Sequence, residues 1–174
     1  GGSVLTLASE LSELAFRGLG WEGVSTAAWR TSSGRVLVSD WAEHDLRGWY
    51  ALHGHDDPVT SPVTPLLQSA GVTSAALTDV TPAVTDFESL WAEVSRIRRR
   101  GYAIVDEEFE KGVVGVSAPV FDFRGTIIAA INVSAPKPRL GAHLDEAGML
   151  TARVAAELSS QLGALPRGWG TGER

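Results

Sequence analysis

Hydrophobic and polar positions in the first third of the chain predict a helix followed by strands. Leucines recur near helical spacing over residues 4–17, and Gly18 follows them, which predicts an opening amphipathic helix. Two strand-like runs come next, at 24–30 and 35–41, and the polar residues between them predict a β-hairpin. Residues 46–52 predict a third strand.

Helix signals become sharper further along the chain. Ser/Thr-Pro pairs over 61–65 are typical of a helix start, because proline is tolerated in the first turn. Asp86 is a suitable N-cap for a helix from 87 to about 100, and Gly101 is a suitable stop. The apolar side of that helix consists of Phe87, Leu90, Val94 and Ile97. A last helix is predicted over 144–162, with a side rich in alanine.

Strands dominate between these two helices. The pattern predicts strands over 102–106, 113–121 and 126–134, and residues 122–125 form a hairpin turn that ends in glycine. The chain shows neither βαβ alternation nor a glycine-rich nucleotide motif. We therefore expect an α+β fold with a mainly antiparallel central sheet flanked by helices.

Composition is that of a soluble globular protein and limits the classes of partner that it can bind. The 174 residues fit a single domain, 1–174, with a disordered tail over 164–174. The formal net charge of −6 disfavours direct contact with DNA or anionic membranes. Cysteine is absent, and no apolar run approaches the roughly 20 residues that span a bilayer. We expect a cytoplasmic protein without a cofactor.

Small and polar residues on the last two strands are the first candidate site. Gly115 and Ser117 share one side of their strand, and Asn132 and Ser134 share one side of the next. Such residues on otherwise apolar strands suit a ligand cavity. The alternative is that these side chains face solvent while the neighbouring valines and Ile131 face the core. The pattern leaves both interpretations open.

Two charged runs have structural explanations. In the acidic run 106–110, strand alternation lets at most two carboxylates face inward, and we expect Asp106 to do so while the others stay exposed. The basic run 96–100 occupies the last turn of a predicted helix, where cations complement the helix dipole. A helix-end role is therefore favoured over nucleic-acid binding.

Histidines give a second candidate site. His53 and His55 would project to the same side of an extended segment, and Asp57 could complete three metal ligands. A metal-dependent hydrolase is thus an alternative function, although a solvated polar loop is the commoner meaning of such a segment.

A series of four motifs narrows the family. In order, the chain reads Arg98-Arg99-Arg100-Gly101-Tyr102-Ala103, Asp106-Glu107-Glu108 with Gly112-Val113, Ser117-Ala118-Pro119-Val120-Phe121-Asp122, and Ala129-Ala130-Ile131-Asn132-Val133-Ser134. This series resembles the C-terminal domain of IclR-type bacterial transcription regulators, most clearly over residues 95–140.

The resemblance implies a GAF-like or profilin-like sensor domain, not an enzyme. It implies that the domain binds a small organic or aromatic acid as effector and forms dimers or tetramers. Family members carry an N-terminal winged helix-turn-helix domain that is absent here, so DNA would be contacted only through that missing domain. A purely structural oligomerisation domain with a filled pocket is a further alternative.

The resemblance also implies ligand-binding positions: Gly48, Trp49, Ala51, Thr64, Pro65, Leu66, Asp106, Gly115, Ser117, Asn132 and Ser134. The residues after Thr64 match a family site where main-chain N–H groups hold the effector carboxylate. Pro62 replaces a usual histidine there, and Pro65 offers no N–H. We therefore expect a bulkier or more apolar effector, with Trp49 or Tyr50 as a stacking partner.

Overall fold

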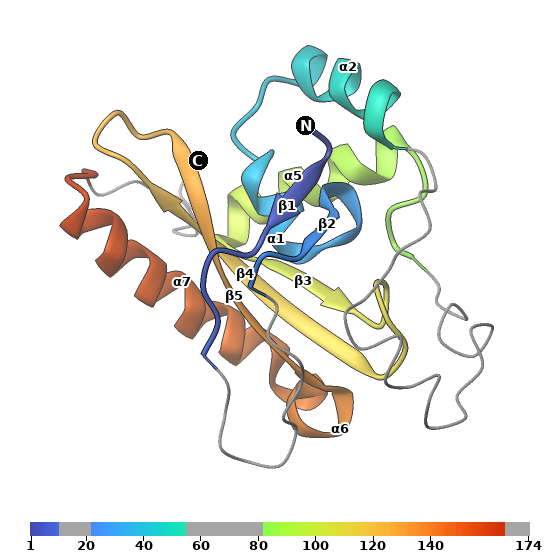
Figure 1. Ribbon diagram of the computed structural model, residues 1–174, viewed down its shortest axis with the longest axis vertical. Coiled ribbons are helices and arrows are strands. Elements are labelled where there is room, and N and C mark those ends of the chain that lie inside the picture. Colours follow the sequence, from blue (N-terminus) through green and yellow to red (C-terminus); the bar gives the residue numbers. More distant parts are fainter. Residues whose placement is uncertain (11–21, 55–81, 166–174) are drawn as a thin grey trace.

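A three-stranded antiparallel sheet forms the centre of the molecule in this computed structural model, which describes residues 1–10, 22–54 and 82–165. The strand order is β3-β4-β5, with β3 at Ala103–Asp106, β4 at Val113–Phe121 and β5 at Ile127–Pro136. Helix α7 (Leu144–Gln161) lies along one face of the sheet (Figure 1), and α1 (Ser32–Leu37) and α5 (Phe87–Arg100) cover the other. Short helices α6 (Lys137–Leu140) and η2 (Gly141–His143) join β5 to α7. The predicted α+β class is confirmed.

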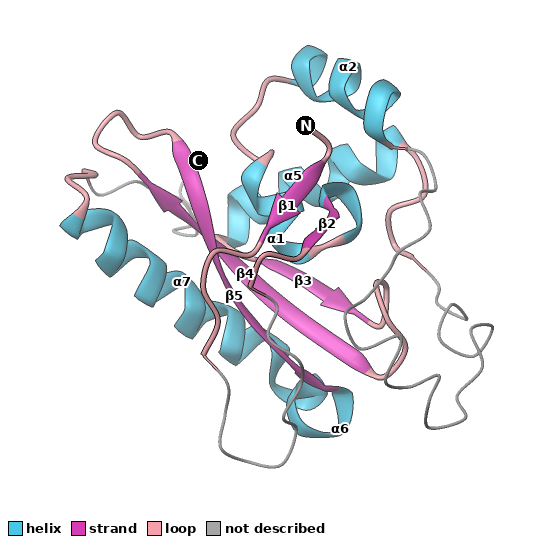
Figure 2. Cartoon of the chain, viewed as in Figure 1, coloured by secondary structure: helices cyan, strands magenta, loops and turns pink. Residues whose placement is uncertain are grey.

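Strand β4 is buried on both sides because it is the middle strand between two helical layers. Every residue from Val114 to Phe121 is buried. Ala118 and Val120 pack against Ala155 of α7, whereas the alternate residue Ser117 meets α1 on the opposite face. Burial on both faces is typical of a central strand. The predicted strands and their hairpin, which Figure 2 shows in magenta, are confirmed.

The turn between β4 and β5 is stabilised by one of its own side chains, that of Asp122. Asp122 accepts hydrogen bonds from the main-chain N–H groups of Arg124 and Thr126, both at 3.0 Å. The bond from Thr126, followed by the contribution of Arg124, holds the pKa of Asp122 below its usual value. Gly125 has φ of 77°, a left-handed conformation that glycine adopts without strain.

Helix α5 begins and ends where the sequence predicts. The Asp86 carboxylate accepts from the Ser89 N–H at 2.8 Å, and Ser89 Oγ accepts from the Asp86 N–H, which together form a capping box. Gly101 ends the helix with φ of 86°. The predicted apolar side of the helix, Phe87 with Leu90, Val94 and Ile97, is buried.

The first 41 residues differ from the prediction. Residues 3–5 form a strand, β1 (Ser3–Leu5), which pairs with β2 (Ser25–Ala27), so the opening helix is wrong at its start; the rest of its span lies largely outside the described residues. The predicted hairpin is also wrong, because the chain turns through η1 (Ala28–Arg30) into helix α1. The Thr31 side chain accepts from the Gly34 N–H at 3.0 Å and caps this helix.

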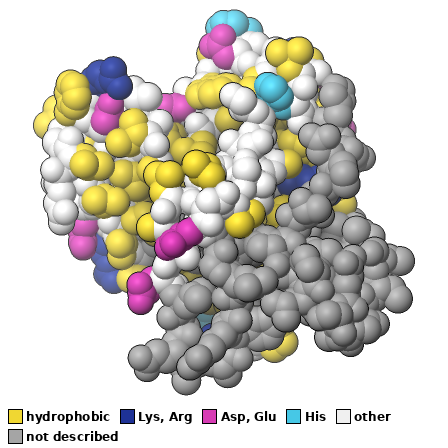
Figure 3. All heavy atoms as spheres, viewed as in Figure 1, with side chains coloured by type: hydrophobic (Ala, Val, Ile, Leu, Met, Phe, Trp, Pro, Cys, Tyr) yellow, Lys and Arg dark blue, Asp and Glu magenta, His cyan; other side chains and the backbone are white. Residues whose placement is uncertain are grey.

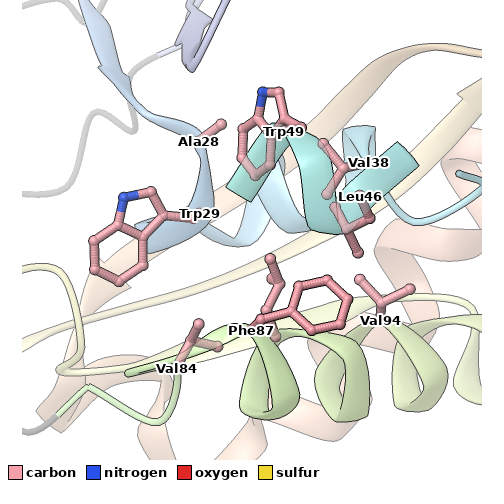
Figure 4. Packing of buried hydrophobic residues seen from close by; sticks show 9 residues of the cluster. Ala28, Trp29, Val38, Leu46, Trp49, Val84, Phe87 and Val94 are labelled. Atoms are coloured by element: carbon pink, nitrogen blue, oxygen red, sulfur yellow. The ribbon is translucent and has the colours of Figure 1, made fainter. Parts of the chain in front are cut away.

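The predicted strand over residues 46–52 is a helix, α2 (Glu43–His53). Leu46 and Trp49 are three residues apart and turn the same side of α2 into a core that includes Val38 and Phe87 (Figure 4). Glu43 and Asp45 lie in the first turn, where acidic residues are favourable. The three-residue spacing of Leu46 and Trp49 therefore fits a helix and not the alternation of a strand.

Candidate functional site

Five polar side chains meet where α1 abuts β4 and β5, and we call them the Ser/Asn cluster: Ser32, Ser33, Ser117, Asn132 and Ser134. Ser117 Oγ lies 2.8 Å from Ser32 Oγ and 3.0 Å from Ser33 Oγ. Asn132 Nδ2 donates to Ser117 Oγ at 3.0 Å, and Ser134 Oγ donates to Asn132 Oδ1 at 2.8 Å. Ser32 and Ser117 are buried, whereas Asn132 and Ser134 are exposed, so the cluster runs from the interior to the surface.

Sheet register and one close backbone approach hold these side chains together. In the antiparallel pairing, Ser117 lies opposite Asn132 and Gly115 lies opposite Ser134. The start of α1 is fixed from behind, because a Cβ on Gly34 would lie 2.0 Å from the Ala28 carbonyl oxygen. Only glycine allows this approach, so the position of the two α1 serines is set by the backbone.

Gly115 allows the cluster to pack closely against β4. A Cβ at this position would lie 3.1 Å from Ser134 Oγ, 3.5 Å from Ser32 Oγ and 3.6 Å from Asn132 Nδ2. A methyl group there would press on the Ser134 hydroxyl and come into contact with the side chains of Ser32 and Asn132. Gly115 and Ser117, with Asn132 and Ser134, are therefore brought together as the sequence suggests, on the side of the sheet that α1 covers.

A buried ion pair fixes α1 to the loop between β3 and β4. Arg35 Nη2 lies 2.8 Å from Glu108 Oε2, and the side chains are 1% and 10% exposed. The Glu108 carboxylate also accepts from the Ala83 N–H at 2.9 Å, and Arg35 Nε donates to the Trp29 carbonyl at 2.9 Å. Three separate parts of the chain therefore meet at this pair.

The acidic loop orients differently from the expectation. Asp106 is exposed and pairs with Lys137 at 2.9 Å, whereas Glu108 and Glu110 are buried, so the prediction of an inward Asp106 is wrong. The loop leaves β3 at Glu107, which has φ of 56° and shifts the strand alternation. The hydrogen bond from Lys137 lowers the pKa of Glu107, with a further contribution from the Gly112 N–H.

The remaining expected positions lie elsewhere. Trp49 is buried in the core beneath α2 and donates from Nε1 to the Gly1 carbonyl at 3.2 Å, while Gly48 and Ala51 lie on the exposed side of that helix. None of the three belongs to the Ser/Asn cluster. Thr64, Pro65 and Leu66 lie outside the described residues, as does most of the tail after residue 164.

Ser32 and Ser33 are the members of the cluster that sequence reasoning missed. They follow Thr31 and precede Gly34, a Thr-Ser-Ser-Gly run whose polar residues predict a hairpin turn. The available signal was a hydroxyl N-cap three residues before a glycine, followed by the apolar run Val36-Leu37-Val38. The contact with Ser117, 85 positions away for Ser32, has no signature in the local pattern.

Of the candidate metal ligands the structure describes only His53, but it describes all of the basic run 96–100. The His53 ring packs 5.7 Å from Trp49, and His55 and Asp57 lie outside the described residues, so the metal site is untested. Within the described ranges, no three His, Asp or Glu side chains gather as metal ligands. Arg98 donates to the carbonyls of Ser39 and Trp41, so this member of the basic run is bonded within the fold.

The fold is that of the C-terminal domains of bacterial transcription regulators. The IclR protein of Thermotoga maritima superposes with a TM-score of 0.69 at 22% identity, over 94% of this chain and 58% of that one. The inducer-binding domain of a double mutant of PobR from Acinetobacter, solved as a complex with 3-hydroxybenzoic acid, gives a TM-score of 0.63 at 25% identity, over 87% of this chain and 76% of that one.

Sequence comparison gives the family itself. The family model "Bacterial transcriptional regulator IclR C-terminal" matches residues 65–160, and the chain belongs to this family. The HTH-type transcriptional regulator BhcR of Paracoccus denitrificans is 39% identical over 91 residues, which is 52% of this chain and 31% of that protein. The chain spans between 17% and 36% of the length of the curated relatives it matches, and those relatives are regulators of transcription, not enzymes.

Proposed function

We propose that this chain is the effector-sensing domain of an IclR-type regulator and that the effector, a small organic molecule, binds at the Ser/Asn cluster. The observation that carries the proposal is the convergence of α1, β4 and β5 on one polar group that opens to the surface beside Gly115. Polar side chains that converge inside a largely apolar fold and reach the surface are typical of ligand sites.

The ion pair between Arg35 and Glu108 supports a sensing role. It ties α1, which presents Ser32 and Ser33, to the β3–β4 loop and to residue 83 at the approach to α5. An effector that binds two arrangements of α1 with different affinity would shift the populations of those arrangements. In the whole regulator, this shift would alter the DNA affinity of the winged helix-turn-helix domain that the resemblance implies.

Contact with DNA through the described part of this domain is disfavoured. The net charge of the chain is −6, and arginines near the end of α5 are engaged with protein oxygens: Arg98 with two carbonyls, and Arg100 with Glu93 at 2.7 Å and with the Tyr102 carbonyl. Phosphate binding needs unpaired basic side chains grouped on one surface. This domain therefore senses and assembles, and another domain contacts DNA.

A ligand screen tests the proposal. Thermal unfolding in the presence of small organic compounds, charged and neutral, should identify compounds that raise the melting temperature in proportion to occupancy. Ser134→Ala should reduce the response, and Ser95→Ala, whose hydroxyl bonds only within α5, is the matched control. If no compound raises the melting temperature, or if both variants respond equally, the cluster is not an effector site.

Self-association is the second part of the proposal. Helix α7 turns small residues toward the sheet and exposes larger apolar ones: Met149, Leu150, Val154 and Leu158, at 58%, 52%, 45% and 37%. Figure 3 shows hydrophobic side chains gathered on the side of the molecule where α7 runs. Val154→Lys should lower the molar mass measured by light scattering if α7 lies in a subunit interface, and an unchanged mass would place the interface elsewhere.

A further inference from the structure

The hydrogen bonds inside the Ser/Asn cluster restrict what a ligand can find there. The amide of Asn132 is the fixed point, because its Nδ2 lies 3.2 Å from the Val116 carbonyl oxygen. A carbonyl only accepts, so the amide nitrogen must face it and the amide oxygen must face outward to Ser134. The Ser134 hydroxyl proton is then committed, since Asn132 Oδ1 can only accept.

The protons and lone pairs of the three inner hydroxyls, those of Ser32, Ser33 and Ser117, can be assigned in the same way. Ser117 Oγ accepts from Asn132 Nδ2, which leaves it one lone pair and one proton, so one of Ser32 and Ser33 donates to Ser117 and the other accepts from it. Ser32 is 4% exposed and needs an internal partner for its proton, whereas Ser33 is half-buried. The hydroxyl proton of Ser33 is therefore the one side-chain donor in the cluster that remains for a ligand.

Acceptors are more plentiful at the same place. Asn132 Oδ1 uses one of its two lone pairs on Ser134, and Ser134 Oγ keeps its own lone pairs at the exposed end of the cluster. The cluster thus offers at least two acceptor atoms and one donor.

The nearby cations among the described residues do not reverse this balance. Arg35, 1% exposed, gives Nη2 to Glu108 and Nε to the Trp29 carbonyl, although its buried Nη1 has no hydrogen-bond partner. The Arg30 guanidinium lies over the Trp29 ring, and Lys137 lies between Asp106 and Glu107. An ionised carboxylate brings only acceptors, and at Asn132 Oδ1 and Ser134 Oγ these would meet oxygen lone pairs. The main-chain N–H groups of Ser32 and Ser33 are the remaining donors that an anion could use.

We propose that the Ser/Asn cluster selects a neutral ligand that carries hydroxyl or amide N–H donors, in preference to a carboxylate. The ligand donates to Asn132 Oδ1 and Ser134 Oγ and accepts from Ser33. The inference rests on the proposed function, since it concerns the same site, but it changes the chemical class of effector that the family resemblance implies. Gly115 matters for this site because a methyl group at the same position would crowd Ser134 Oγ, 3.1 Å from its Cβ.

Matched pairs of probes test the selection. Each pair has the same carbon skeleton and replaces a neutral hydroxymethyl group by a carboxylate: 3-hydroxybenzyl alcohol against 3-hydroxybenzoate, benzyl alcohol against benzoate, and ethylene glycol against glycolate. Binding is measured at pH 7 by titration followed with amide NMR shifts of the whole chain. We expect the neutral member of a binding pair to bind at least tenfold more tightly, and its affinity to stay constant between low and high salt.

Two variants and one control connect the affinity to named atoms. Ser134→Ala removes an acceptor at the exposed end of the cluster and should weaken the alcohol about fivefold, a typical loss for one hydrogen bond. Ser95→Ala, the control on α5, should leave the affinity unchanged. Gly115→Ala should weaken every probe that binds, while its amide spectrum shows that the fold is retained.

The outcomes separate the two proposals. If the carboxylates bind more tightly than their neutral partners, the inference is overturned while the cluster remains an effector site. If no member of any pair moves the resonances of residues in the cluster, both the inference and the proposed function are overturned.

Discussion

Removal of the Glu108 carboxylate is the most informative perturbation of the fold. Glu108→Ala leaves the Arg35 guanidinium, 1% exposed, without its anionic partner and also removes the acceptor of the Ala83 N–H. Loss of one partner of a buried pair is far more costly than loss of an exposed pair, because the remaining charge stays desolvated.

The size of the destabilisation expected for Glu108→Ala follows from the geometry of the ion pair. At 2.8 Å the attraction between the two charges is about 6 kcal/mol with an effective dielectric constant near 20, most of which offsets the cost of desolvating both groups. Breaking such a pair destabilises the folded state by about 3–5 kcal/mol. With a urea m-value of about 2 kcal/mol per molar, the unfolding midpoint should fall by about 1.5–2.5 M.

Urea unfolding followed by tryptophan fluorescence measures this change, and the chain supplies a matched control. Glu88 makes a comparable pair with Arg47 at 3.1 Å, but the side chains are 72% and 52% exposed, so Glu88→Ala should cost less than about 1 kcal/mol. The double variant Arg35→Met with Glu108→Ala should recover at least half of the loss. Equal midpoints for the two single alanine variants would refute the reasoning.

Three further predictions concern elements around the sheet. Gly148→Ala should destabilise the fold by about 1–3 kcal/mol in urea unfolding despite the helix propensity of alanine, because its Cβ would lie 2.3 Å from the Tyr102 ring. Asp86→Ala removes the cap of α5 and should cost about 1 kcal/mol in the same assay. Burial, followed by the bond to Asp145, raises the pKa of Tyr102 above 10.0, so the folded state holds this proton more tightly than the unfolded state. The unfolding free energy should therefore decrease as pH rises past about 10, and less so in Tyr102→Phe.

Effector binding is the prediction with the widest consequence for function. The convergence of Ser32 and Ser33 with residues of two strands gives the cluster a defined set of donors and acceptors. A compound that binds there should protect the amides of α1 from hydrogen exchange, since α1 supplies part of the site. Protection confined to α2, which carries Trp49, would indicate a different site.

The second half of the chain was determined by short-range signals. Asp86 and Gly101 mark the ends of α5 because a capping side chain and a left-handed glycine act within four residues of the helix terminus. The turn after β4 is fixed in the same local manner by Asp122 and Gly125. Alternation along β4 and β5 also showed correctly which of their residues share a side.

Only the tertiary structure decided the secondary structure of the first part of the chain and the burial of side chains in the acidic loop. Residues 35–41 have strand-like side chains, yet most of them enter or follow α1 because Thr31 caps a helix whose side packs on β4 and β5. Glu108 turns inward because Arg35, 73 positions away, is buried beside it. Local propensity is worth a fraction of a kcal/mol per residue, whereas leaving a buried charge without its distant partner costs several, so the distant contacts prevail. The Ser/Asn cluster also depends on contacts between distant segments, since Ser32 and Ser117 lie 85 positions apart in the sequence.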